Sequence, residues 1–415
     1  MGVEGERSMR LAGRKWPGDL LLAVGVYAVT SLPFLFGLAL ALTPGVMVHQ
    51  DGRPPTFLQY SLIYDGAYFR DIADRGYWVH EDRQSGIAFF PGQAVAAWAV
   101  SRATGWETAL SLVVVSNAAF VAALAFLAGY LRSRFPDLSL GGRATVLAAV
   151  GLYPAGLYFR IAYSESLFLA CVALLMLGLA RRWPVVVLAL VAGAATGVRA
   201  VGVACTGAVL AHVLLDRERG PLRRRIAECA ALGPLACWGL LAFMAHQWAE
   251  FGNPFAFADA QRHWGHDVRP FAGITSRWVR LLIAEPVWNA FTPGSQRYWG
   301  FIDYHGVPGI GQGFWNPVVL TAAVVFVAVG WGRGVLTRTE GLLGLALLLI
   351  PYLSRGHEMS LGSHARFVSV ALPSFVVFGR LLARGPGVAC GLAFAVMASL
   401  LTVWSAMFGA WWPLF

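Results

Sequence analysis

One carboxylate stands apart in the stretch YDGAYFRDIADRGYW, which runs from Tyr64 to Trp78 in a very apolar chain. Asp65 opens this stretch, and several further charges follow it closely. A carboxylate at a membrane surface could act as a general base that takes the proton of an attacking hydroxyl. It could equally cap a helix that begins near Gly66, because aspartate is a preferred N-cap residue. The sequence leaves both interpretations of Asp65 open.

The residues that follow predict an amphipathic helix over 66–75. Tyr68 and Ile72 lie four residues apart on one side, which is the spacing of a single helical face. Such a helix is expected to lie on the membrane surface. Asp71 and Arg75 would lie on the opposite side, where the simplest interpretation is an i,i+4 ion pair.

Two later stretches place ionisable side chains between apolar runs. Tyr163 and Glu165 lie within 153–168, and Arg199 interrupts the apolar run 184–215. Glu165 either caps the helix that follows or faces a polar cavity. An arginine at membrane depth needs a partner or water. Arg199 therefore either forms a structural ion pair with Glu165 or binds a lipid phosphate, which a guanidinium group holds bidentately.

Three further stretches supply aromatic, amide and charged side chains. Residues 86–94 form a rigid apolar corner that would be either an interfacial anchor or a wall for a lipid chain. Residues 251–271 carry many hydrogen-bonding side chains and a tryptophan whose flat apolar face suits a sugar ring. Arg366 would pair with Glu358 or bind phosphate. The side chains singled out are Phe89, Phe90 and Pro91 for lipid, and Gln261, Trp264 and His266 for substrate.

The composition predicts an integral membrane protein. The chain has 415 residues, of which 57% are hydrophobic and 13% are charged, whereas soluble domains carry about 25% charged residues. Many apolar runs reach roughly the 20 residues that a membrane-spanning helix needs. The net charge of +10 fits arginines in cytoplasmic loops better than nucleic-acid binding. The five cysteines lie inside apolar runs without a CxxC pair, so no disulfide framework is expected.

The arginine clusters predict the topology of an all-α polytopic protein with a single integral membrane domain, residues 1–415. If these clusters are cytoplasmic, about eleven helices cross the membrane, with the N-terminus inside and the C-terminus outside. The polar candidates then meet on the extracytoplasmic face. The expected spans are 19–42, 108–131, 144–160, 165–181, 184–200, 201–216, 226–248, 316–332, 340–354, 366–382 and 387–410.

The same topology divides the domain into five parts. They are a first span at 19–42, a first extracytoplasmic loop at 43–107, central helices at 108–248, a long extracytoplasmic loop at 249–315 and C-terminal helices at 316–415. Within the first loop, segment 87–103 has both ends outside. It is therefore expected to re-enter the membrane or to lie in its interface, where its backbone must be buried in protein or line a cavity.

Taken in order, the motifs resemble those of the PIG-V family (GPI mannosyltransferase 2-like proteins) and its bacterial relatives, within the GT-C superfamily. The matching motifs are YDG (64–66), IADRGY (72–77), AFFP (88–91), PAGLYFRIAYSESLF (154–168), GVRAVG (197–202), GNPFAFADAQRHW (252–264) and ARFVSVALP (365–373). Two departures stand out. Tyr64 occupies the place of the family's usual tryptophan, and GVRAVG keeps Arg199 but lacks two hydroxyls of the family's turn.

This resemblance implies a GT-C-like membrane enzyme of the bacterial cytoplasmic membrane, with its active site on the extracytoplasmic face. The implied reaction is inverting transfer of a mannosyl residue from polyprenyl-phosphate mannose to an acceptor. That acceptor would be a glycolipid or another cell-envelope molecule, and membrane lipids would be further partners. Asp65 would be the base, and Arg199 and Arg366 would bind the donor phosphate. The implied substrate contacts are Tyr64, Tyr163, Glu165, Gln261, Trp264 and His266.

The implied scheme needs no metal ion or other cofactor, and no nucleic acid takes part. Two alternatives stay open. One is a GT-C transferase that uses another prenyl-linked sugar. The other is a lipid or sugar transporter without transferase chemistry, which would also need charges and broken helices inside the membrane.

Overall fold

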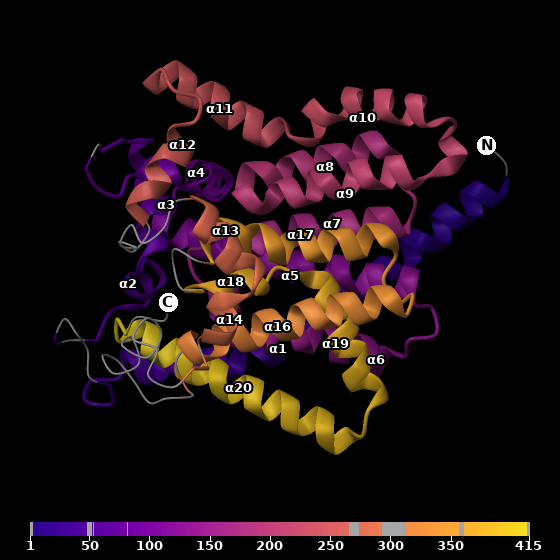
Figure 1. The fold of residues 1–415 in the computed structure, drawn as a ribbon. Coiled ribbons are helices and arrows are strands. Elements are labelled where there is room, and N and C mark those ends of the chain that lie inside the picture. The colour runs from indigo at the N-terminus through magenta and orange to yellow at the C-terminus, as the bar shows by residue number, and fades with distance from the viewer. Residues whose placement is uncertain are drawn as a thin grey trace.

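The described part of the chain is built from helices and turns and contains no β-strand. The computed structural model describes residues 3–47, 52, 54–80, 82–264, 274–289, 291–292, 310, 312–356 and 361–412. Figure 1 shows the longer helices running side by side across the molecule. Short helices cap one end of this bundle.

The first half of the bundle surrounds α5, which packs most extensively against α7 and also contacts α1 and α4. Its elements are α1 (Val3–Leu42), α2 (Phe57–Ser61), α3 (Asp65–Arg75), η1 (Gly86–Ala88), α4 (Gly92–Thr104), α5 (Thr108–Arg134), α6 (Leu140–Gly151), η2 (Pro154–Phe159), α7 (Glu165–Ala180), α8 (Val185–Val198), η3 (Ala200–Gly202) and α9 (Val203–Leu215).

The second half covers this core, with α20 against α1, α19 against α6 and α17 against α9. Its elements are η4 (Arg217–Arg219), α10 (Leu222–Ala236), α11 (Trp238–Phe251), α12 (Ala256–Ala260), η5 (Gln261–Trp264), α13 (Ile274–Leu282), α14 (Glu285–Asn289), α16 (Gln312–Gly332), α17 (Arg338–Arg355), α18 (His364–Val368), α19 (Leu372–Arg384) and α20 (Gly387–Gly409).

Among the residues that the structure describes, four helices are long and apolar enough to cross a membrane, or five if the bent pair α10–α11 counts as one span. The four are Pro17–Leu42 within α1, Thr108–Arg134, Phe314–Gly332 and Gly387–Gly409. The chain is thus an integral membrane protein by length and apolarity of its helices. A helix lies at each predicted span, but several are too short to cross alone, so the expectation of eleven full-length spans is not confirmed.

Proline explains why two expected spans are broken. The span expected at 226–248 consists of α10 and α11, which meet at 55° just after Pro234, a residue that cannot donate to the helical ladder. The span expected at 144–160 ends at Gly151, and Pro154 begins the 3₁₀ helix η2. Continuous apolarity therefore does not guarantee a continuous helix.

Arg160 holds the broken segment after α6 in place. Its side chain is buried, with 2% exposure, and it donates hydrogen bonds to the carbonyl oxygens of Gly151 (3.1 Å), Gly156 (2.8 Å) and Thr30 (2.9 Å). The carbonyls at a helix C-terminus lack intrahelical donors and need such partners inside a membrane. Arg160 thus fastens η2 to α6 and α1.

The two ends of the bundle differ in chemistry. In Figure 1, α2, α3 and α12 gather at one end, on the left, which we call the site end. The start of α10 and the turn between α16 and α17 lie at the other end, on the right. There the buried Asp19 pairs with Arg132 (2.6 Å) and Arg143 (3.7 Å). The sequence prediction that this second end is cytoplasmic rests on its arginines.

The helix α3 begins at Asp65, one residue earlier than predicted, and buries Gly66, Phe69 and Ile72. This face packs against α4 and α5, so part of the helix contacts protein. Asp71 pairs with Arg70 at 2.8 Å in place of the predicted partner. The following helix α4 has 13 residues and also packs on α5. The positions of α3 on the membrane surface and of 87–103 in the membrane stay predictions.

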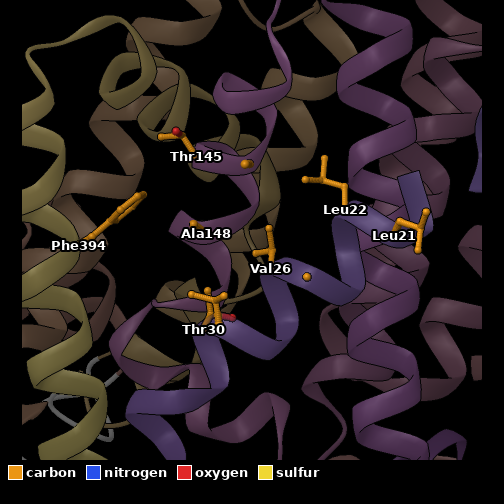
Figure 2. A pocket seen from close by; sticks show the side chains of 10 residues that line it. Leu21, Leu22, Val26, Thr30, Thr145, Ala148 and Phe394 are labelled. Atoms are coloured by element: carbon orange, nitrogen blue, oxygen red, sulfur yellow. The ribbon is translucent and has the colours of Figure 1, made fainter. Parts of the chain in front are cut away.

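An apolar groove of about 430 Å³ lies between α1, α6 and α20. Figure 2 shows Leu22, Val26, Ala148 and Phe394 around it, with Thr30 as one of its few polar groups. Its lining residues include no carboxylate and no guanidinium group, so they offer neither a general base nor a cation for a phosphate.

Accessibility of introduced cysteines tests the two ends. Asp82→Cys and Leu140→Cys are introduced one at a time into a variant without the native cysteines. Each thiol should react with a membrane-impermeant maleimide, because both positions are exposed. The two thiols should react from opposite sides of the membrane, because the loops that carry them are predicted on opposite faces. Labelling in vesicles of known orientation measures this, with a membrane-permeant maleimide as the control. Labelling of both thiols from one side contradicts the topology.

Candidate active site

Arg366 joins two carboxylates that lie far apart in the sequence. Its Nη1 atom lies 2.6 Å from Oδ2 of Asp65 at the start of α3. Its Nε atom donates to Oε1 of Glu165 at the start of α7. The rings of Tyr163 and Tyr158 face the guanidinium group at 4.6 Å and 5.1 Å, a cation–π arrangement. These contacts fix Arg366 at the centre of the site.

Glu165 binds a second arginine through the same oxygen. Nη1 of Arg199 lies 2.5 Å from Oε1 of Glu165 and 3.1 Å from the hydroxyl of Ser164. The ion pair between Arg199 and Glu165, one of the two sequence interpretations, is therefore present. Ser164 occupies the N-cap position of α7, but its side chain makes no capping bond. We call Asp65, Glu165, Arg199 and Arg366 the charge cluster.

Exposure separates the two carboxylates of the charge cluster. The side chain of Glu165 is fully buried, at 0% exposure, whereas that of Asp65 is 19% exposed. The arginine side chains are intermediate, at 14% for Arg199 and 12% for Arg366. A substrate can therefore approach Asp65, while Glu165 lies behind the arginines.

Both arginines keep donor groups that no described residue uses. Arg199 engages its partners through Nη1, and Arg366 through Nε and Nη1. The carboxylates of Asp65 and Glu165 beside Arg366 favour the charged form of its guanidinium group. The cluster thus offers permanently charged N–H donors to an anion that reaches it.

The backbone before Asp65 is strained. Tyr64 has φ 55° and ψ −116°, a region that bulky residues rarely adopt and that often marks functional sites. Tyr64 occupies the N-cap position without a side-chain cap, and Asp65 is the first helical residue. The alternative in which Asp65 caps the helix is therefore wrong, because its carboxylate extends to Arg366.

Gly66 allows this turn to form. A Cβ atom at Gly66 would lie 2.6 Å from the carbonyl oxygen of Ser61 and 3.4 Å from Cβ of Ala162. The first distance is shorter than real contacts allow, so only glycine fits. This close approach gives a physical reason for the glycine in the motif YDG.

Tyr64 packs on the end of α20. Its ring lies 5.9 Å from that of Phe408 and 5.5 Å from that of Trp411, and its hydroxyl reaches the Trp411 carbonyl at 3.4 Å. Partial burial raises the pKa of Tyr64 to about 12, so it stays neutral. Tyr163 is more deeply buried, at 1% exposure, and contacts the turn around Asp65 from within.

The predicted substrate residues after α11 are only partly described. Gln261 donates from Nε2 to the carbonyl of Ala88 (3.1 Å) and accepts from Arg355 on α17. It thereby links η5 to η1 and α17. The side chain of Trp264 and the whole of His266 lie outside the described residues, as does Glu358, the partner predicted for Arg366.

The apolar corner AFFP divides into a core residue and two more accessible ones. Phe90 is 6% exposed and packs on Phe243 (5.2 Å) and Phe257 (5.4 Å). Phe89 is half-buried and stacks on Tyr68 at 4.7 Å. Pro91, also half-buried, occupies the N-cap position of α4. Phe89 and Pro91 are thus the more accessible candidates for lipid contact.

Two aromatic neighbours of the site were not singled out from the sequence. Tyr158 faces Arg366, and Trp411 packs on Tyr64. Tyr158 lies within the motif at 154–168, so its proximity to Glu165 was a usable signal. Trp411 gave none, because its contact joins opposite ends of the chain.

Comparisons with known proteins give a distant likeness. No protein-family model matches the chain, and no curated protein matches its sequence. Among solved structures, the chain is similar to the crystal structure of ArnT from Cupriavidus metallidurans bound to undecaprenyl phosphate. The match has 14% identity and a TM-score of 0.44, and it covers 93% of this chain and 75% of that chain. The chemistry of this chain has to follow from its own residues.

Replacing the buried carboxylate tests the role of Glu165 in holding the cluster. Glu165→Gln leaves two arginines with one fewer counter-charge in a buried site, so we expect a loss of about 3–5 kcal/mol in the free energy of unfolding. Chemical denaturation of the detergent-solubilised protein measures this.

The matched control is Glu228→Gln, which removes a carboxylate from a more exposed pair with Arg219 (2.8 Å). Such a pair contributes about 0–1 kcal/mol. Equal stability losses in the two variants would show that Glu165 is not the anchor of the charge cluster.

Proposed function

We propose that this chain is a membrane-embedded inverting glycosyltransferase that moves a mannosyl residue from polyprenyl-phosphate mannose to an extracytoplasmic acceptor. The observation that carries the proposal is an accessible carboxylate, Asp65, paired with Arg366, which a buried glutamate holds together with a second arginine, Arg199. The motif resemblance to the PIG-V family, which includes these four residues, supports the same reaction.

Asp65 serves as the general base. The acceptor hydroxyl gives its proton to the Asp65 carboxylate as its oxygen forms a bond to the anomeric carbon of the sugar. The bond between that carbon and the phosphate oxygen breaks at the same time, and polyprenyl phosphate leaves with the electron pair. A single displacement inverts the configuration at the anomeric carbon.

Glu165 does not take part as a second reacting carboxylate. Retaining glycosyl transfer of the glycosidase type needs a carboxylate nucleophile in contact with the sugar. Glu165 is fully buried, and its Oε1 atom already accepts from Arg199 and Arg366. One exposed carboxylate backed by a buried one fits inversion better than a covalent intermediate.

Arg199 and Arg366 bind the donor phosphate. Negative charge grows on the phosphate as the bond to the sugar breaks, and fixed cations stabilise that charge without rearranging. The N–H groups that described residues leave unused are available for the phosphate oxygens. Their shared anchor, Glu165, keeps both guanidinium groups oriented before the donor arrives.

A lipid-linked donor also accounts for the location of the site. The charge cluster includes the first residues of α3 and α7, and it lies beside the broken ends of apolar helices. At such a position the phosphate of the donor can stay hydrated while its polyprenyl chain stays in hydrocarbon. Half-buried aromatic residues of the first loop, such as Phe89, are candidates to contact that chain. The acceptor is a glycolipid or another cell-envelope molecule.

Transfer by the purified protein tests the base. With radiolabelled polyprenyl-phosphate mannose and a membrane-lipid extract, Asp65→Asn should lower the transfer rate by about 100-fold or more, because an amide cannot accept the proton. Polyprenyl-phosphate glucose tested in parallel distinguishes the donor sugar.

The matched control is Asp71→Asn, which removes a carboxylate on the same helix that pairs with Arg70 outside the charge cluster. It should keep transfer near the native rate. Full activity of Asp65→Asn would rule out the base assignment. An intact donor with no transfer by the folded native protein would contradict mannosyl transfer, and would point either to another prenyl-linked sugar or to transport in place of chemistry.

A second measurement addresses the phosphate. Arg199→Lys keeps the positive charge beside Glu165 but loses the planar fork, so the Kd for polyprenyl phosphate should rise about tenfold, the loss of roughly one charge-assisted hydrogen bond. Binding to the detergent-solubilised variant measures it. Arg219→Lys, in the exposed pair with Glu228, is the control, and an unchanged Kd in Arg199→Lys contradicts a phosphate-binding role.

A further inference from the structure

One buried hydroxyl bridges the strained turn that precedes Asp65. The hydroxyl of Tyr163 donates to the carbonyl oxygen of Ile63 at 2.8 Å and accepts from the backbone N–H of Asp65 at 3.3 Å. These two backbone groups flank Tyr64, the residue with φ 55°. The Tyr163 side chain therefore connects both sides of the strained residue.

The same side chain supports the counter-ion of Asp65. The Tyr163 ring faces the guanidinium group of Arg366 at 4.6 Å, and that group lies 2.6 Å from the Asp65 carboxylate. Tyr163 thus contacts the backbone of Asp65 through its hydroxyl and the partner of its carboxylate through its ring. One side chain therefore constrains both the backbone of Asp65 and the counter-ion of its carboxylate.

Tyr163 is itself fixed from behind. Its carbonyl oxygen accepts from the hydroxyl of Ser116 (3.0 Å), which in turn accepts from Nε2 of Gln93 (3.0 Å). The preceding residue, Ala162, donates its N–H to the carbonyl of Ser61 at 3.3 Å. The segment around Tyr163 is therefore anchored to α5 and, through Ser116, to α4, and it is aligned along the turn before α3.

A strained backbone conformation persists only where its surroundings over-determine it. Without the Tyr163 hydroxyl, the Ile63 carbonyl and the Asp65 N–H would lose this partner, and Tyr64 could relax. Asp65 would then turn with the backbone, since it is the next residue. Small displacements of a reacting group reduce rates strongly even when binding is preserved.

We propose that Tyr163 is a positioning residue for Asp65, acting through the strained turn and through Arg366, and not a substrate contact. Its 1% exposure fits this role. The proposal rests on the proposed function of Asp65 as a base, and it replaces the sequence-based expectation that Tyr163 contacts substrate.

The variant that isolates the hydroxyl is Tyr163→Phe, which keeps the ring against Arg366. We expect kcat to fall about tenfold, while the KM values for donor and acceptor stay within about twofold, because binding groups are kept and only the base is misaligned. An increase in KM with an unchanged kcat would overturn the proposal, because it would indicate a substrate contact.

The matched control is Tyr60→Phe. Tyr60 is equally buried, and its hydroxyl donates to a backbone carbonyl, that of Ser405, at 3.0 Å. This variant loses the same kind of hydrogen bond outside the Asp65 turn, so it should lose comparable thermal stability and keep kcat. Equal falls of kcat in both variants would show that Tyr163 acts only through stability, and would overturn the proposal.

A readout without transferase activity keeps the two proposals apart. In a variant without the native cysteines, the thiol of Asp65→Cys reports the freedom of the turn through its rate of reaction with a maleimide. Adding Tyr163→Phe should speed this reaction at least threefold, and adding Tyr60→Phe should leave it unchanged. The rate can be measured even if the native protein transfers no sugar, a result that would count against the proposed function alone.

A milder variant covers the case in which Tyr163→Phe does not fold. Ser116→Ala removes the hydrogen bond to the Tyr163 carbonyl and leaves the hydroxyl itself in place, so it should lower kcat in the same direction but by less. An unchanged kcat together with an unchanged thiol reaction rate, in whichever of these variants folds, would overturn the positioning role.

Discussion

The arrangement of the site end depends on one buried carboxylate. Glu165 has no exposure, and a carboxylate out of water is tolerated only with compensating charge and hydrogen bonds. Its Oε1 atom receives Arg199 from the end of α8 and Arg366 from α18. Both segments must therefore approach the first turn of α7. Because Arg366 also reaches Asp65, the same requirement sets the position of α3.

Broken helices make this convergence possible inside a membrane protein. The chain leaves α6 at Gly151, passes through the 3₁₀ turn η2, and only then begins α7 with Glu165. Backbone outside regular helices must be satisfied by protein at such depth, and Arg160 meets part of that need by donating to the carbonyl oxygens of Gly151 and Gly156. One buried arginine thus stabilises the bend that delivers Tyr163 and Glu165 to the site.

The sequence located the helices well and their continuity less well. Apolar runs predicted a helix at each expected position, because burial in lipid or in the bundle selects the same residues. The predicted lengths of the helices were wrong where Pro154 or Pro234 interrupted an apolar run. The mean hydropathy of a run does not change much when a single residue lacks its backbone N–H. The alternative in which Asp65 caps a helix failed for a related reason. A cap must be the last residue before the helix begins, and no spacing reveals that the helix begins at Asp65 itself.

By itself, the sequence determined a helical membrane protein, an order of motifs, and the identity of the charged residues that an apolar chain must compensate. Local rules suffice for these features, since hydropathy and propensity act over neighbouring residues. Only the tertiary structure decided that Arg366 bridges Asp65 and Glu165, and that Tyr163 braces the turn before Asp65. Such pairings join segments from across the chain, and several arginines could have met the charge of Glu165 equally well. The packing of α7, α8 and α18 selected which ones did.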